Sequence, residues 1–191
     1  MYIRKILIGI LILGILGGCY IMYNISQTIF KPITAFNNEV AYIYIPSDAD
    51  FKYVKGELEP LLNDMEAFET LAKKLGYKKR VKGGKYIIRK GMNSNDLVKT
   101  LLNKGILVDV IIPNTNKSQE IAAEVSTYIE ATEKQLTSVM ENTMFLKKLI
   151  QEKKLKDSAI YKPGTYKMPW STTAEAFRDY MVKNSQKQTQ Q

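Results

Sequence analysis

The aromatic and hydroxyl side chains near the end of the chain are its most chemically suggestive residues. The stretch YKPGTYKMPWSTTAEAF runs from Tyr161 to Phe177 and places aromatic rings and a Ser/Thr run before a helical pattern. Tyr and Trp faces stack on sugar rings, so Tyr161, Tyr166 and Trp170 could form a platform for a glycan. The same rings could instead pin the loop to the core, with their polar tips bonded to protein partners. The residues alone leave both interpretations open.

The composition excludes several kinds of catalytic and metal site. The 191 residues contain no histidine and a single cysteine, Cys19. Histidine-dependent triads, His-ligated metals and multi-cysteine sites are therefore excluded. The acidic pairs are Glu57 with Glu59, on different faces of a helix, and Glu130 with Glu133, near a polar helix junction. We interpret all four as exposed surface acids, so the sequence predicts no catalytic constellation, no metal and no cofactor.

The first 30 residues have the pattern of a membrane anchor. Arg4 and Lys5 precede an apolar core from Ile6 to Tyr23, which is long enough to cross the hydrocarbon of a bilayer. The charges before the helix predict a single-pass protein of the cytoplasmic (inner) membrane, with its N-terminus inside and the bulk of the chain outside the cytoplasm. The alternative is a lipoprotein signal, because LGGC ending at Cys19 loosely resembles a processing site. The apolar run continues past this cysteine, which favours the anchor.

The chain is basic, with a formal net charge of +9, and its Lys and Arg residues are densest from Lys73 to Lys90. No nucleic-acid motif accompanies them, and an exported location argues against nucleic acid as a partner. Anionic lipid headgroups or anionic wall polymers are better candidates. A solvated basic face is the simpler interpretation.

The periodicity of the rest of the chain predicts an α+β fold. Residues 31–39 form a linker, and residues 40–115 alternate strands and helices in a compact β-α-α-β-α-β module. Its predicted strands are 40–46, 85–89 and 106–113. Its first two predicted helices are 50–58 and 64–75. A third helix is predicted to begin at a Ser94 cap and to end at Gly105. Residues 116–191 are mostly helical, with helices at 118–129, 132–140, 143–153 and 173–184 and an extended segment at 159–168.

Four stretches, taken in order, carry a resemblance to a known family. They are VAYIYIPSDADFKYV, FETLAKKLGY, VKGGKYIIRKGMNSNDLVKTLLNKG and IYKPGTYKMPWSTTAEAFRDYM. Together they resemble the N-terminal half of the MltG-like (YceG-like) endolytic murein transglycosylases, and the last looks most like the Bacteroidetes branch. The resemblance covers essentially the whole chain. Its sharpest block consists of Pro163, Thr165, Tyr166, Trp170, Thr172 and Ala174.

The resemblance implies a protein of the bacterial wall. The family is anchored in the cytoplasmic membrane by one helix (here 1–30), followed by a LysM-like glycan-binding module (40–115) and a catalytic domain, of which 116–191 would be the start. Such enzymes cut nascent peptidoglycan strands without water and leave a 1,6-anhydro end, with one glutamate serving as acid and then base. The implied partner is therefore the glycan strand, with Tyr86 joining Tyr161, Tyr166 and Trp170 as candidate glycan-binding residues.

The sequence departs from the family where the catalytic residue would lie. The family's catalytic glutamate belongs to a helix motif downstream of the Pro-x-Thr-Tyr block, and no residue in Met1–Gln191 matches that motif. No catalytic residue is therefore carried over, and we expect binding of glycan without cleavage. The alternatives are a non-enzymatic interaction or regulatory protein of wall synthesis, and a fragment of an active transglycosylase.

Overall fold

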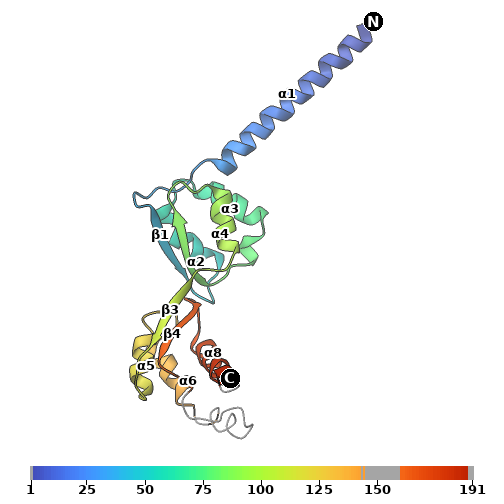
Figure 1. Ribbon diagram of the computed structural model, residues 1–191. Helices are drawn as coiled ribbons and strands as arrows, with labels where there is room; N and C mark the ends of the chain where they lie inside the picture. Colours follow the sequence, from blue (N-terminus) through green and yellow to red (C-terminus); the bar gives the residue numbers. More distant parts are fainter. Residues whose placement is uncertain (1, 143, 145–159, 189–191) are drawn as a thin grey trace.

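The computed structural model describes residues 2–142, 144 and 160–188, which form a long N-terminal helix followed by two packed cores (Figure 1). The first part comprises α1 (Tyr2–Phe30), β1 (Val40–Ile45), α2 (Phe51–Leu58), η1 (Glu59–Leu61), α3 (Met65–Lys74), η2 (Tyr77–Lys79), β2 (Gly84–Arg89) and α4 (Ser94–Leu102). The second comprises β3 (Leu107–Ile112), α5 (Ser118–Val125), α6 (Glu133–Met140), β4 (Gly164–Pro169) and α8 (Ala174–Gln188). The predicted α+β class is confirmed. The predicted helix at 143–153 lies outside the described residues.

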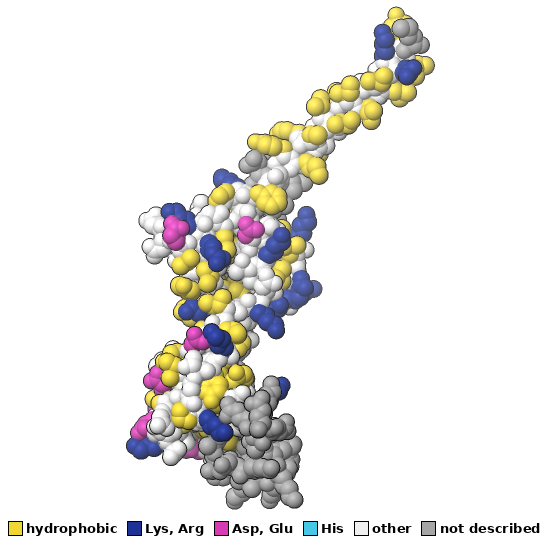
Figure 2. All heavy atoms as spheres, viewed as in Figure 1, with side chains coloured by type: hydrophobic (Ala, Val, Ile, Leu, Met, Phe, Trp, Pro, Cys, Tyr) yellow, Lys and Arg dark blue, Asp and Glu magenta, His cyan; other side chains and the backbone are white. Residues whose placement is uncertain are grey.

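Helix α1 projects away from both cores, and hydrophobic side chains follow it along its length (Figures 1 and 2). Its segment Tyr2–Tyr23 is long and apolar enough to cross a membrane, and none of that segment is buried against the rest of the protein. The helix continues unbroken through Cys19 to Phe30. An exposed apolar helix of this length is suited to a single-pass anchor.

Residues 31–39, predicted as a linker, are bound to the first core. Ile33 is buried, and its amide donates to the Met92 carbonyl at 2.9 Å while its carbonyl accepts from the Asn63 amide at 2.9 Å. Pro32 and Thr34 make further bridge contacts with the same core. Because buried backbone groups are bonded on both sides of Ile33, the anchor helix passes into the first core without a free tether.

The first core is a β1–β2 antiparallel pair covered on one face by α2, α3 and α4 (Figure 1). Each of its α-helices begins at a short acidic or amide side chain that accepts a hydrogen bond from a backbone amide of the first turn. Asp50 caps α2, Asp64 caps α3 and Asn93 caps α4. The predicted cap of α4, Ser94, is instead the first helical residue and is buried. Gly76, with a left-handed φ of 72°, follows the last residues of α3 and ends the helix.

Strand β3 belongs to the second core and corrects the prediction that residues 106–113 complete the first module. It pairs antiparallel with β4, from Leu107 opposite Pro169 to Ile112 opposite Gly164. Its buried residues Val110 and Ile112 pack with α5, α6 and α8. The hydrophobic alternation identified the strand correctly, but its partner lies more than fifty residues further along, in the predicted extended segment.

The two cores meet at two glycines that leave no room for a side chain. A Cβ on Gly83 would lie 2.8 Å from the Ser171 Cβ and 2.8 Å from the Ser47 Cα. A Cβ on Gly105 would lie 2.8 Å from the Lys85 carbonyl oxygen, beside the point where the Ile106 amide donates to that oxygen at 2.8 Å. These separations are below van der Waals contact, so glycine permits the close approach of the cores.

The contact at Gly83 predicts a loss of stability in Gly83→Ala. The added methyl meets backbone as well as the Ser171 side chain, so we expect a destabilisation of about 1–3 kcal/mol, typical of overpacking. Urea unfolding of the full chain in detergent, followed by tryptophan fluorescence, measures the change.

Gly56→Ala is the matched control, because no atom lies within 4 Å of a Cβ at that position of α2. This variant should be neutral or stabilised by about 0.4–1 kcal/mol. Equal unfolding midpoints for Gly83→Ala and wild type would contradict the tight packing of the two cores.

Candidate functional site

The outer face of the β1–β2 pair carries exposed aromatic side chains. Ile43 and Ile45 point into the core, so the alternate residues Tyr42 and Tyr44 face outward, 49% and 37% exposed. In the register of the pair, Tyr44 lies opposite Lys85. Helices α2, α3 and α4 pack on the inner face, which leaves these rings open to a ligand.

Lys85 lies between the two tyrosine rings. Its Nζ is 4.6 Å from the centroid of the Tyr42 ring and 5.3 Å from that of Tyr44. Both distances fall within the range of cation–π attraction, which contributes about 0.5–1 kcal/mol at exposed sites. Both rings therefore favour this position of the ammonium group.

Trp170 extends the aromatic surface onto the second core. It follows β4 directly, and its ring centroid lies 5.0 Å from that of Tyr44 at an interplanar angle of 63°. This is an edge-to-face contact, the favoured arrangement for two aromatic rings. We call Tyr42, Tyr44, Lys85 and Trp170 the aromatic face; it joins side chains from both cores.

Glu130 fixes the second core to the first beside the aromatic face. Its two carboxylate oxygens accept from the Ser47 amide at 3.1 and 3.0 Å, and the Ser47 hydroxyl lies 3.1 Å from one of them. Its own amide donates to the Trp170 carbonyl at 2.7 Å. Glu130, predicted as an exposed surface acid, is half-exposed and bonded to the first core, whereas Glu133 is exposed as predicted. Glu130 acts as a structural contact between the cores.

Three of the four predicted glycan-binding residues contact a core: Tyr86 is buried in the first, and Tyr161 and Tyr166 are half-buried against the second. Tyr86 is buried in the first core, where its hydroxyl donates to the Lys82 carbonyl at 3.0 Å. Tyr161 stacks on Phe177, and Tyr166 donates from its hydroxyl to the Lys162 carbonyl at 2.9 Å. All three rings thus contact a core; the Tyr86 and Tyr166 hydroxyls are bonded to carbonyls, and the Tyr161 hydroxyl is buried without a partner among the described residues.

Among the four predicted residues, Trp170 is the one on the aromatic face; its neighbours Tyr42 and Tyr44 were not predicted as binding residues. A signal for them existed in the VAYIYIP stretch, because strict alternation places tyrosine and isoleucine on opposite faces of a strand. If the isoleucines form the core, the tyrosines must face outward.

Much of the basic stretch 73–90 has structural partners. Arg80 donates to the Leu75 carbonyl at the end of α3, and Lys82 donates to the Leu102 carbonyl at the end of α4. Cations are favourable at these helix ends because the last carbonyls carry partial negative charge. Other Lys and Arg side chains gather on the surface of the first core (Figure 2).

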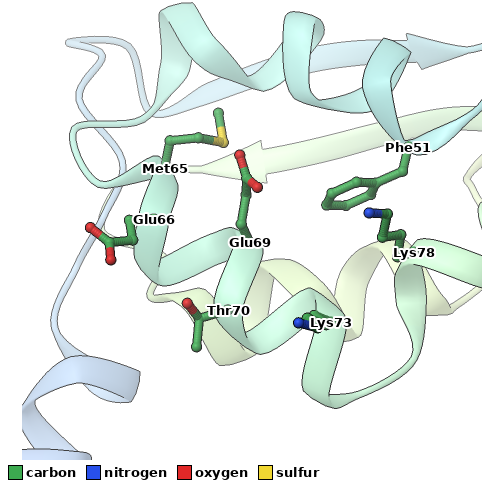
Figure 3. A pocket seen from close by; sticks show the side chains of 7 residues that line it. All are labelled: Phe51, Met65, Glu66, Glu69, Thr70, Lys73 and Lys78. Atoms are coloured by element: carbon green, nitrogen blue, oxygen red, sulfur yellow. The ribbon is translucent and has the colours of Figure 1, made fainter.

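A shallow pocket of about 420 Å³ lies between α2, α3 and η2 (Figure 3). It is lined by Phe51, Met65, Glu66, Glu69, Thr70, Lys73 and Lys78. The Glu69 carboxylate pairs with Lys55 at 2.7 Å, and the Lys78 ammonium lies 6.0 Å from the Phe51 ring centroid. Groups of both signs share the pocket, so it presents no single charge to a ligand.

The described residues contain no group of side chains suited to bind a metal ion. Within these residues no three acidic or cysteine side chains gather in a way that could hold an ion. The aromatic face is the surface suited to a ligand, and ring faces with a fixed cation favour binding by stacking and charge.

The architecture defines an α+β protein with an apolar N-terminal helix suited to a membrane anchor and an open aromatic surface across two cores. The YceG-like family model matches residues 43–191, and the chain belongs to this family. Family membership confirms the resemblance found in the sequence and supports a role in the cell envelope.

A solved structure of a putative YceG-like protein from Listeria monocytogenes matches 80% of this chain at 19% identity, with a TM-score of 0.38. The chain covers 56% of that protein's length. No curated protein matches the chain.

The contact between Ser47 and Glu130 predicts that Glu130→Ala loosens the two cores. Losing hydrogen bonds to a charged acceptor at this partly exposed position should cost about 1 kcal/mol. Urea unfolding followed by tryptophan emission reports the change directly, because Trp170 is the single tryptophan of the sequence and lies at the junction.

Glu133→Ala removes the same side chain three residues away at an exposed position and serves as the control. It should leave the unfolding midpoint within about 0.5 kcal/mol of wild type. If the two variants behave alike, Glu130 does not join the cores.

Tyr161 predicts a stability change in alkaline solution. Burial raises the pKa of its phenol to about 12, and its hydroxyl is buried without a hydrogen-bond partner among the described residues. Because the pKa of this phenol is higher in the folded state than in the unfolded chain, its contribution to stability is fully present below about pH 10, the unfolded pKa. This contribution is lost as the pH rises toward about 12. Tyr161→Phe should therefore lose less stability than wild type between pH 10 and 12, measured by urea unfolding at each pH. An identical pH dependence in both proteins would contradict the burial of this phenol.

Proposed function

We propose that this protein is held in the cytoplasmic membrane by α1 and binds peptidoglycan glycan strands on its aromatic face. Membership of the YceG-like family supports a cell-envelope role and a glycan partner. The observation that carries the proposal is the line of exposed Tyr42 and Tyr44 beside Trp170. Ring faces open to solvent are the groups that stack on sugars, and their hydroxyl and indole tips can bond sugar hydroxyls.

The order of elements in the first core supports the same proposal. Strand β1, helices α2 and α3 and strand β2 follow one another in the β-α-α-β order expected of a LysM-like module. Arg4 and Lys5 before the apolar helix favour an N-terminus inside the cell and the two cores outside, where the wall lies.

We further propose that residues 1–191 bind glycan without cleaving it. A general acid must reach the bond that breaks and be free to donate a proton. Glu130 is the acid next to the aromatic face, because its amide donates to the Trp170 carbonyl. Both of its carboxylate oxygens accept from the Ser47 amide. Incubation with uncrosslinked glycan strands should therefore yield no 1,6-anhydro ends, and their appearance would refute this part of the proposal.

A role in docking a wall-synthesis protein is the alternative. Sedimentation of the detergent-solubilised chain with insoluble peptidoglycan separates the two, because a protein-docking role predicts no retention by purified wall. Retention that depends on the aromatic face supports glycan binding.

Tyr44→Ala should reduce retention on peptidoglycan at least several-fold. The substitution removes one exposed ring and the edge-to-face support of Trp170, a contact worth about 0.5–1.5 kcal/mol in addition to buried area. Trp170→Ala should act in the same direction.

Tyr180→Ala is the matched control, since Tyr180 is 39% exposed on α8 and contacts Tyr166 instead of the aromatic face. Retention should be unchanged in this variant. Equal losses in Tyr44→Ala and Tyr180→Ala would argue against a defined binding surface.

A further inference from the structure

We propose that Lys85 makes the aromatic face selective for glycans whose sugars carry a carboxylate. The inference rests on the proposed glycan binding and adds the chemical class of the bound strand. It depends on where the ammonium group lies and on which charges surround it.

The position of Lys85 prepares it to meet an anion. Its Nζ is held between the rings of Tyr42 and Tyr44, at 4.6 and 5.3 Å from their centroids. An ammonium has three N–H donors, so contacts with two rings leave at least one donor that an anion can use. A lysine already confined in this way loses less side-chain entropy on binding than a free surface lysine.

The surrounding charge favours an anionic ligand. Lys85 forms no ion pair with a carboxylate in the described part of the chain. Arg89 faces outward on the same strand, and no Asp or Glu occurs between Glu69 and Asp96 in the sequence. Glu130, the carboxylate bonded at the junction, already accepts from Ser47.

A carboxylate-bearing strand matches this arrangement of rings and cation. Stacking on exposed aromatic rings orients the sugars, and a carboxylate on a sugar substituent can then accept from the fixed ammonium. Peptide-free peptidoglycan strands have this chemistry, because each lactyl group ends in a free carboxylate. A neutral strand would gain the stacking but not the charge-assisted hydrogen bond.

The experiment compares one glycan in two charge states. Peptide-free strands are divided, and one half has its carboxylates converted to neutral amides. Binding of each to the full chain in detergent is measured at low and moderate salt. Wild type should bind the carboxylate form about fivefold more tightly than the amide form, the upper range for an exposed ion pair. The difference should shrink as salt rises.

Lys85→Gln should lose this preference while still binding the amide form, and Lys85→Arg should restore it. Lys79→Gln makes the same charge change at an exposed position outside the aromatic face and should keep the preference. Unchanged circular dichroism and unfolding midpoints confirm that each variant folds.

Two results would overturn the inference while leaving glycan binding intact. One is equal binding of both strand forms by wild type. The other is an equal loss of preference in Lys79→Gln, which would assign the effect to general basic charge. Failure of wild type to bind either form would overturn the proposed glycan binding as well.

Discussion

The close contact between the two cores is the constraint on which the rest of the structure depends. Gly83 brings backbone and side chains of both cores together with no space for a methyl group. Beside it, the Ser47 amide and hydroxyl bond to the Glu130 carboxylate. The hydrogen bonds orient the second core relative to the first, and the contact at Gly83 sets the separation between them. Together they hold the two cores in one arrangement.

This arrangement creates a surface that neither core has alone. The β1–β2 pair supplies Tyr42, Tyr44 and Lys85, and the residue after β4 supplies Trp170. The Glu130 amide holds the Trp170 carbonyl, so the contact that joins the cores also positions the ring. Because residues 31–39 are bound to the first core, α1 carries this surface without an intervening tether.

Local patterns predicted the elements well, and long-range partners less well. The helices predicted at 50–58, 64–75 and 132–140 are present, because their starts depend on capping side chains within a few residues: Asp50, Asp64 and Thr132. The partner of β3 could not be predicted, because alternation identifies a strand but not the strand it pairs with.

The candidate site shows the same limit. Aromatic residues are chemically suggestive, yet Tyr86 is buried in the first core, and Tyr161 and Tyr166 lie half-buried against the second. The distinction depends on which rings pack against a core, and this is decided by contacts between segments that are distant in the sequence. The central claim, that glycan binds across both cores, is tested most directly by the emission of Trp170 during titration with glycan strands. A saturable change that Tyr44→Ala abolishes is predicted. Unchanged emission at concentrations where the protein sediments with peptidoglycan would contradict it.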